Sequence, residues 1–215
     1  MLTKSPPRPR ALVASALAVL LSGAWLALNR ESAEARTVIG RAELKLAAGT
    51  SIGIVTFENP KDGDATVVKV DLKIAVGTFE TQTFHGLHIH ANEDASNGAG
   101  CVADATRPSN TWFVAADGHL KRDANEGHGG HSGDLSSVYL NRDGTVHLEF
   151  STDRFVAGAL FDRAVVLHAG ADNFGNVPVG TAAAQYSPNS SDATAATRNT
   201  GNSGDRVACG VIDVK

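Results

Sequence analysis

The sequence contains few cysteines, no excess of positive charge and no sustained helical pattern. Cys101 and Cys209 are the only cysteines among 215 residues, and neither lies near the amino terminus. Attachment to a membrane through an amino-terminal lipidated cysteine is therefore excluded. After residue 35, apolar residues do not keep the period of about 3.6 residues that marks an amphipathic helix, which argues against a helical fold.

Acidic residues outnumber basic residues, with 23 Asp and Glu against 19 Lys and Arg. The first 35 residues hold four of the basic and two of the acidic residues, so the rest of the chain carries a formal charge of −6. A surface with this charge repels the phosphate backbone. Nucleic acid is therefore not expected as a partner.

The first 35 residues have the pattern of an export signal. Positive charges come first, at Lys4, Arg8 and Arg10. An uncharged apolar run then spans residues 11–28, and small residues follow at positions 33 and 35. This pattern predicts a signal peptide over residues 1–35 and a mature domain over residues 36–215.

The apolar run is also long enough to remain as an amino-terminal membrane anchor, so cleavage and anchoring both stay open. In either case the protein would be exported to the periplasm, the cell envelope or the medium. An isolated pair of cysteines in such a compartment is expected to form a disulfide.

The remainder of the chain predicts an all-β fold. Short runs rich in β-branched residues, several of them alternating between apolar and polar residues, are separated by turn residues. Strands are expected at residues 38–46, 52–57, 65–75, 84–90, 135–140, 145–150, 164–167 and 207–211. Asn-Arg-Asp-Gly at residues 141–144 is a hairpin signal. Many short strands with frequent turns are typical of a sandwich or barrel.

Two long segments do not follow the strand pattern. Residues 91–133 are rich in Gly, Asn, Asp and His, and residues 172–205 are rich in Gly, Ser, Asn, Thr and Ala. Loops of this length in a compact domain are usually functional or disordered. Because three histidines fall in the first segment and His168 lies just before the second, we interpret both as functional loops.

Histidines form the main candidate site. His88 and His90 lie two residues apart in a strand-like stretch, so their side chains should point to the same side. Two such imidazoles can bind copper, zinc, iron or nickel, although histidines bonded inside the core would give the same local pattern. Further ligand-type residues follow at His119, His128, His131, Asp134 and His168. Histidines with one carboxylate suit zinc, and strand-borne histidines suit a redox copper.

Four motifs in this sequence resemble, in the same order, those of the copper–zinc superoxide dismutases. They are the histidine stretch at residues 84–90, the end of the glycine-rich loop at 133–135, the strand at 163–168 and the stretch around Cys209 at 200–212. The resemblance covers roughly residues 38–211. It implies an eight-stranded antiparallel Greek-key sandwich or flattened barrel, similar to the immunoglobulin fold, with two long functional loops.

The resemblance also implies a role for each candidate residue. The copper ligands would be His88, His90, His119 and His168. The zinc ligands would be His119, His128, His131 and Asp134, so that His119 bridges the two metals. Asp172 would bond a ligand histidine on each metal, Arg206 would hold the substrate anion, and Cys101 would pair with Cys209. His85 would be a hydrogen-bonded framework histidine.

The implied activity is the dismutation of superoxide to dioxygen and hydrogen peroxide, with one copper and one zinc per subunit of a monomer or homodimer. Because superoxide crosses membranes poorly, an exported enzyme would act outside the cytoplasm. Two other functions stay open. A copper-binding or delivery protein would need neither His119 nor Arg206, and a zinc-bound surface module would not need strand-borne copper ligands.

Three features depart from the family pattern. His128 and His131 are only three residues apart, residues 91–97 lack the usual glycine, and residues 177–205 contain no lysine. Because His128 and His131 are so close in sequence, we expect zinc to be held less securely than copper. We also expect Arg206 to carry more of the task of attracting the substrate.

Overall fold

Antiparallel strands build the part of the chain that the computed structural model describes, residues 36–60, 65–98, 100–173 and 191–214. The expected signal peptide or anchor at residues 1–35 lies outside these described residues, as does part of the second long loop. Within the described ranges, no helix is long and apolar enough to cross a membrane.

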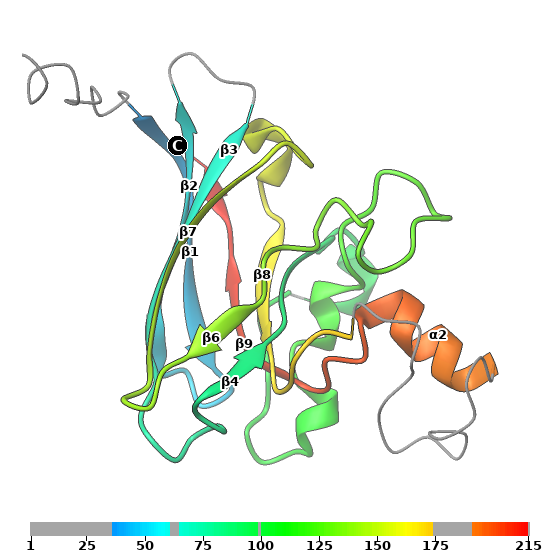
Figure 1. The fold of residues 1–215 in the computed structure, drawn as a ribbon. Coiled ribbons are helices and arrows are strands. Elements are labelled where there is room, and N and C mark those ends of the chain that lie inside the picture. Colours follow the sequence, from blue (N-terminus) through cyan, green and yellow to red (C-terminus); the bar gives the residue numbers. More distant parts are fainter. Residues whose placement is uncertain (1–35, 61–64, 99, 174–190, 215) are drawn as a thin grey trace, which may run out of the picture. The chain divides into compact units, whose positions relative to one another are not determined.

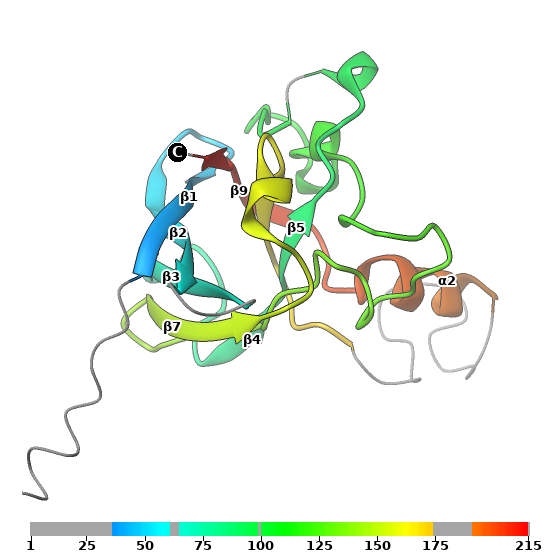
Figure 2. The same cartoon turned by 90° about the horizontal axis from the view of Figure 1, so that it is seen from above.

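The described residues form ten strands. They are β1 (Arg36–Leu46), β2 (Ser51–Pro60), β3 (Thr66–Lys73), β4 (Thr83–His85), β5 (Leu87–His90), β6 (Val138–Leu140), β7 (Thr145–Thr152), β8 (Ala164–His168), β9 (Arg206–Val211) and β10 (Asp213–Val214). Seven of them pair in the order β5-β8-β9-β1-β2-β3-β7, β10 pairs with β1, and β4 pairs with β6. The large sheet curls, as Figures 1 and 2 show from two directions.

This arrangement confirms the antiparallel all-β prediction. The two strands beyond the eight expected have simple causes. The histidine stretch is divided at Gly86 into β4 and β5, because Gly86 N–H donates to Gly170 and not to a strand partner. The carboxyl terminus adds the short β10.

Alternation of apolar and polar residues places one face of β1 and one face of β5 in the main core. In β5, Leu87 and Ile89 are buried in the main hydrophobic cluster. Because successive strand residues point to opposite faces, His88 and His90 project to the other side. Burial of the two aliphatic side chains therefore fixes the direction of both histidines.

The predicted hairpin around residues 141–144 is only half right. The turn forms, with Gly144 N–H donating to Asn141 and Asn141 N–H donating to Thr145. The strands on either side separate, since β6 pairs with β4 and β7 pairs with β3. Pairing with sequence-distant strands has overridden the local pattern.

The interpretation of residues 172–205 as loop throughout is wrong, because helix α2 spans Ser191–Thr200. Ala195 and Ala196 favour helix, and Asp192 near the start and Arg198 near the end complement the helix dipole. The residues are mostly small or polar, so no apolar period marks the helix. In both views α2 lies on the far side of β5 and β8 from β2 and β3 (Figures 1 and 2).

The described part of the chain also contains four short 3₁₀ helices. They are η1 (Ala95–Asn97), η2 (Ser109–Thr111), η3 (Val114–Ala116) and η4 (Ala157–Leu160). The first three lie within the first long loop. The expected disulfide is confirmed, and Cys101 is bonded to Cys209 across 108 residues of sequence. It ties the first loop to β9, beside Trp112 and Val166.

The disulfide should contribute strongly to stability, because it closes a long loop in the unfolded chain. Replacing both cysteines with serine should lower the free energy of unfolding by roughly 4–5 kcal/mol. Urea denaturation of the protein and of the double variant measures this difference. Reductant should destabilise the protein but leave the double variant unchanged. Two free thiols per chain in unfolded, unreduced protein would contradict the prediction.

Candidate metal centre

Four buried histidines converge at the edge of the large sheet. His88 and His90 come from β5, His168 ends the neighbouring strand β8, and His119 arrives from the first long loop. One ring nitrogen of each lies within 4.8 Å of the others. A backbone bridge between His90 and His119 brings the loop to the strand. We call this set the first cluster.

Hydrogen bonds determine which nitrogen of each ring faces the first cluster. His90 Nδ1 donates to the Asp117 carbonyl at 2.8 Å, and His168 Nδ1 donates to the Gly204 carbonyl at 3.0 Å. His88 Nε2 donates to Asp172 Oδ1 at 2.9 Å. Because carbonyl and carboxylate oxygens only accept, these nitrogens carry the ring protons. The opposite nitrogens keep their lone pairs.

Those three opposite nitrogens, and one nitrogen of His119, have no hydrogen-bond partner among the described residues. They are His88 Nδ1, His90 Nε2, His119 Nε2 and His168 Nε2. An unpartnered buried polar atom is unusual, and four lone pairs aimed at one another fit a shared cation. Imidazole suits copper, so the first cluster fits a copper ion.

The second cluster shares His119. Its Nδ1 lies 2.9 Å from Asp134 Oδ1 and 3.3 Å from His131 Nδ1. His131 Nδ1 is 3.2 Å from the same carboxylate oxygen, and His128 Nε2 is 3.8 Å from it. The four residues expected to bind zinc are therefore brought together. Three imidazoles and one carboxylate fit a tetrahedral zinc ion.

By distance alone, His88 also belongs with His119, His128 and Asp134, in place of His131. Hydrogen bonding separates the two histidines. His88 presents a protonated nitrogen on this side, because its Nε2 donates to Asp172. His131 Nε2 donates to the Glu126 carbonyl at 2.9 Å, so its Nδ1 keeps a lone pair towards the second cluster.

His128 depends on helix α2 and on the turn that follows it. Its backbone N–H donates to the Arg198 carbonyl at 2.6 Å. Its ring packs against Gly201, where an added Cβ would lie 2.5 Å from the ring. Gly201 also has a φ of +61°, which other residues rarely adopt.

Asp172 contacts both clusters. Its Oδ1 lies 2.9 Å from His88 Nε2 and 3.5 Å from His128 Nε2, and its Oδ2 accepts from Ser137 Oγ at 2.9 Å. Burial raises the pKa of Asp172, but the bonds from His128 and His88 outweigh it and hold that pKa well below its usual range. A Cβ at position 86 would lie 2.6 Å from Oδ1, so Gly86 leaves room for this carboxylate.

Burial also controls the charge of the clusters. It lowers the pKa of His119 to about 4, against the raising effect of Asp134, and lowers those of His90 and His168 well below the usual value. The rings are therefore neutral near pH 7, as metal ligation requires. Burial raises the pKa of Asp134, but the bond from His119 and nearby histidines bring it to about 2.

Arg206, the first residue of β9, lies beside the first cluster. Its guanidinium donates to the carbonyls of Phe113 and Asp117, each at 2.5 Å. Asp117 O also accepts from His90. One carbonyl therefore fixes both a histidine of the first cluster and Arg206.

Comparison with known proteins identifies the family. Residues 51–212 match the family model described as copper/zinc superoxide dismutase. The chain belongs to this family. It is 34% identical over 192 residues to a Cu-Zn superoxide dismutase of Mycolicibacterium paratuberculosis, with 85% of this chain and 77% of that protein covered. It is 37% identical over 168 residues to a Cu-Zn superoxide dismutase of Mycobacterium tuberculosis, covering 76% of this chain and 65% of that protein.

Two solved structures are similar in fold. The clock protein EA4 gives a TM-score of 0.53 at 23% identity, with 85% of this chain and 96% of that chain covered. A double mutant of a SOD-like protein from Bacillus subtilis gives a TM-score of 0.51 at 19% identity, with 79% and 94% covered. At these identities the likeness concerns the fold alone.

Asp117 contributes to the site but was not predicted from the sequence. It has φ 65° and ψ −159°, a conformation that is essentially restricted to glycine. Its carboxylate holds the backbone N–H groups of Glu93 and Asp94 and the side chain of Asn97. Asp117 orients His90 and Arg206 through its backbone carbonyl. Every residue has a backbone carbonyl, so the residue type does not predict this role. The only feature of the sequence that could have indicated a role for Asp117 is its position two residues before His119.

His85 stays outside both clusters. It is buried, its Nδ1 lies 3.0 Å from the His168 carbonyl and its Nε2 lies 3.0 Å from the Glu80 carbonyl. The expectation of a hydrogen-bonded framework histidine is confirmed.

Asp172 provides a test of the coupling between the clusters. Asp172→Asn keeps the size of the side chain but removes the charge that His88 and His128 share. We expect metal affinity to fall about 10- to 100-fold. Metal content after dialysis against a graded chelator, measured by mass spectrometry, gives the result. Ser137→Ala, which removes only the bond to Oδ2, should have a smaller effect. Unchanged affinity in Asp172→Asn would contradict this role.

Proposed function

We propose that this protein is a superoxide dismutase, which converts two superoxide anions and two protons into dioxygen and hydrogen peroxide. Family membership supports the reaction class. The observation that carries the proposal is the placement of His119, with Nε2 in the first cluster and Nδ1 in the second. A site that only stores copper needs no ring shared in this way.

We assign copper to His88, His90, His119 and His168, and zinc to His119, His128, His131 and Asp134. When bound, copper would supply one-electron redox chemistry, and zinc, which has no redox chemistry, would supply charge and rigidity. The tautomers inferred from the hydrogen bonds support this division. Each of the three strand histidines is oriented by an oxygen of a loop residue, namely Asp117, Asp172 or Gly204.

The reaction consumes two protons, and His119 Nε2 is the atom at which this chain would hold one of them. The ring is buried, so bulk water has little access to it. Asp134 and His131 hold the Nδ1 side. The ring therefore keeps its orientation when Nε2 takes up or releases a proton.

Arg206 would bind the anion. Two of its N–H groups are used by the carbonyls of Phe113 and Asp117, and guanidinium has five donors in a fixed plane. The remaining donors suit a two-oxygen anion. The charge of Arg206 reaches the site, since it contributes, after burial and His119, to the lowered pKa of His90.

We further propose that residues 1–35 direct export and that the enzyme acts outside the cytoplasm. The disulfide supports an oxidising compartment. Cell fractionation with sequencing of the mature amino terminus tests this proposal. A protein found in the cytosol with residues 1–35 intact would overturn it.

A superoxide consumption assay on protein loaded with copper and zinc tests the main proposal. Turnover that requires copper separates a dismutase from a copper-delivery protein and from a zinc-bound surface module. Protein that binds one copper per chain but does not turn over superoxide would support the copper-delivery function instead. Zinc without copper would favour the surface module.

Replacing Arg206 should separate anion binding from metal binding. Arg206→Gln should retain copper, lose at least about tenfold in kcat/KM and show a weaker dependence of rate on ionic strength, because the attractive charge is gone. Arg41→Gln removes the same charge from the exposed face of β1 and serves as the control. If activity per copper is unchanged while the melting temperature falls, Arg206 is structural.

A further inference from the structure

The segment from His128 to His131, here called the link, is unusually short for two zinc ligands. Hydrogen bonds hold it from two sides. On one side, Asp134 Oδ2 accepts from Gly129 N–H at 2.7 Å and from His131 N–H at 3.0 Å. This leaves Asp134 Oδ1 for the histidines of the second cluster. The carboxylate therefore both folds the link and faces the proposed zinc ion.

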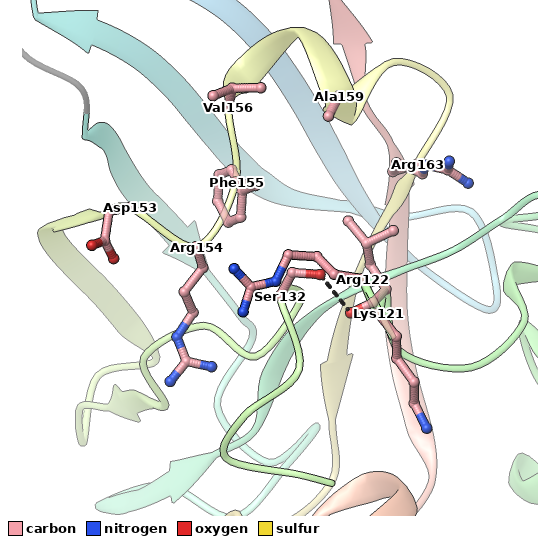
Figure 3. Close-up of a pocket in the computed structure, with 10 residues that line it drawn as sticks. Lys121, Arg122, Ser132, Asp153, Arg154, Phe155, Val156, Ala159 and Arg163 are labelled. Carbon is pink, nitrogen blue, oxygen red and sulfur yellow. Dashed lines mark hydrogen bonds between the residues drawn. The ribbon is translucent and has the colours of Figure 1, made fainter. Parts of the chain in front are cut away.

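On the other side, Arg154 binds the carbonyls of the same two residues. Its Nη1 donates to His131 O at 2.8 Å and its Nη2 donates to Gly129 O at 2.9 Å. Arg154 reaches the link from the segment that follows β7, more than twenty residues along the chain. Figure 3 shows its side chain extended towards the green loop.

The short link needs such support. Gly129 has φ 88°, and Gly130 N–H donates to Gly127 O at 2.9 Å to close a turn. Two adjacent glycines lose more backbone entropy on ordering than other residues would. Without external bonds, the turn would leave His131 Nδ1 and Asp134 Oδ1 free to separate.

We propose that Arg154 is a positioning residue for the zinc centre. Its planar fork fixes the two carbonyls, while Asp134 fixes the two N–H groups, so that the link presents ligands from His128, His131 and Asp134 together. The proposal rests on the zinc site proposed above. It explains how a three-residue spacing between two ligand histidines can close around one ion.

The sign of the expected effect distinguishes this role from simple electrostatics. A guanidinium repels a zinc dication, so removing its charge would by itself tighten zinc binding. Loss of the two bonds from Arg154 to the carbonyls of Gly129 and His131, which we call the clamp, should weaken zinc binding. Lysine keeps the charge but cannot reproduce the two parallel bonds of the guanidinium fork.

The experiment compares zinc release from the copper- and zinc-loaded protein and from Arg154→Gln and Arg154→Lys, using a chromogenic chelator at neutral pH. We expect zinc affinity to fall about 10- to 100-fold in Arg154→Gln and by a smaller factor in Arg154→Lys, with copper retained in both. The visible spectrum of cobalt placed in the zinc site should also change in both variants. Arg142→Gln is the matched control, since Arg142 is exposed and bonds Gln82.

Zinc affinity equal to or greater than that of the unaltered protein in both Arg154 variants would overturn the clamp while leaving the zinc site intact. Failure of the unaltered protein to bind zinc would overturn the zinc site itself, and the clamp with it. Asp134→Ala, which removes a ligand, gives the reference for full zinc loss.

Discussion

Each strand histidine of the first cluster donates a hydrogen bond from its ring N–H to a fixed oxygen. The chemistry of the site depends on these bonds. The acceptors are the Asp117 and Gly204 carbonyls and the Asp172 carboxylate. All three lie outside the strands. The strands therefore provide the direction of the histidines, and the loops select the nitrogen that faces the cluster. The disulfide from Cys101 to Cys209 holds the first of these loops against β9.

The two clusters cannot be rearranged independently. His119 contributes a nitrogen to each, and Asp172 contacts one histidine of each. Helix α2 joins this network through the bond from His128 N–H to Arg198. Helix α2 is thus connected through His128 to the Asp172 carboxylate, which also bonds His88. The network makes the second long loop part of the site, although the proposed ligand sets include no residue after His168.

Much of this arrangement could be predicted from the sequence. The β-branched alternation gave the strands, and the period of two placed His88 and His90 on one face. The features that were not predicted have three separate physical causes. Helix α2 lacks an apolar period because few of its residues are apolar, and β6 and β7 separate because each pairs with a distant strand. Asp117 and Arg154 act through backbone carbonyls, which every residue possesses, so their contacts depend on tertiary structure.

The partners of Arg206 bear directly on its proposed role. Arg163 donates to the Glu93 carboxylate at 2.8 Å, which neutralises its charge locally. Arg206 is held by two carbonyls. Burial lowers the pKa of Arg206 and the charge of the Asp117 carboxylate acts to raise it, but among the described residues no ion pair joins Arg206 to a carboxylate. A carbonyl fixes a guanidinium in place while cancelling less of its charge than a carboxylate would. In a chain with an excess of acidic residues, this leaves a positive charge beside the first cluster, where an approaching anion would be attracted.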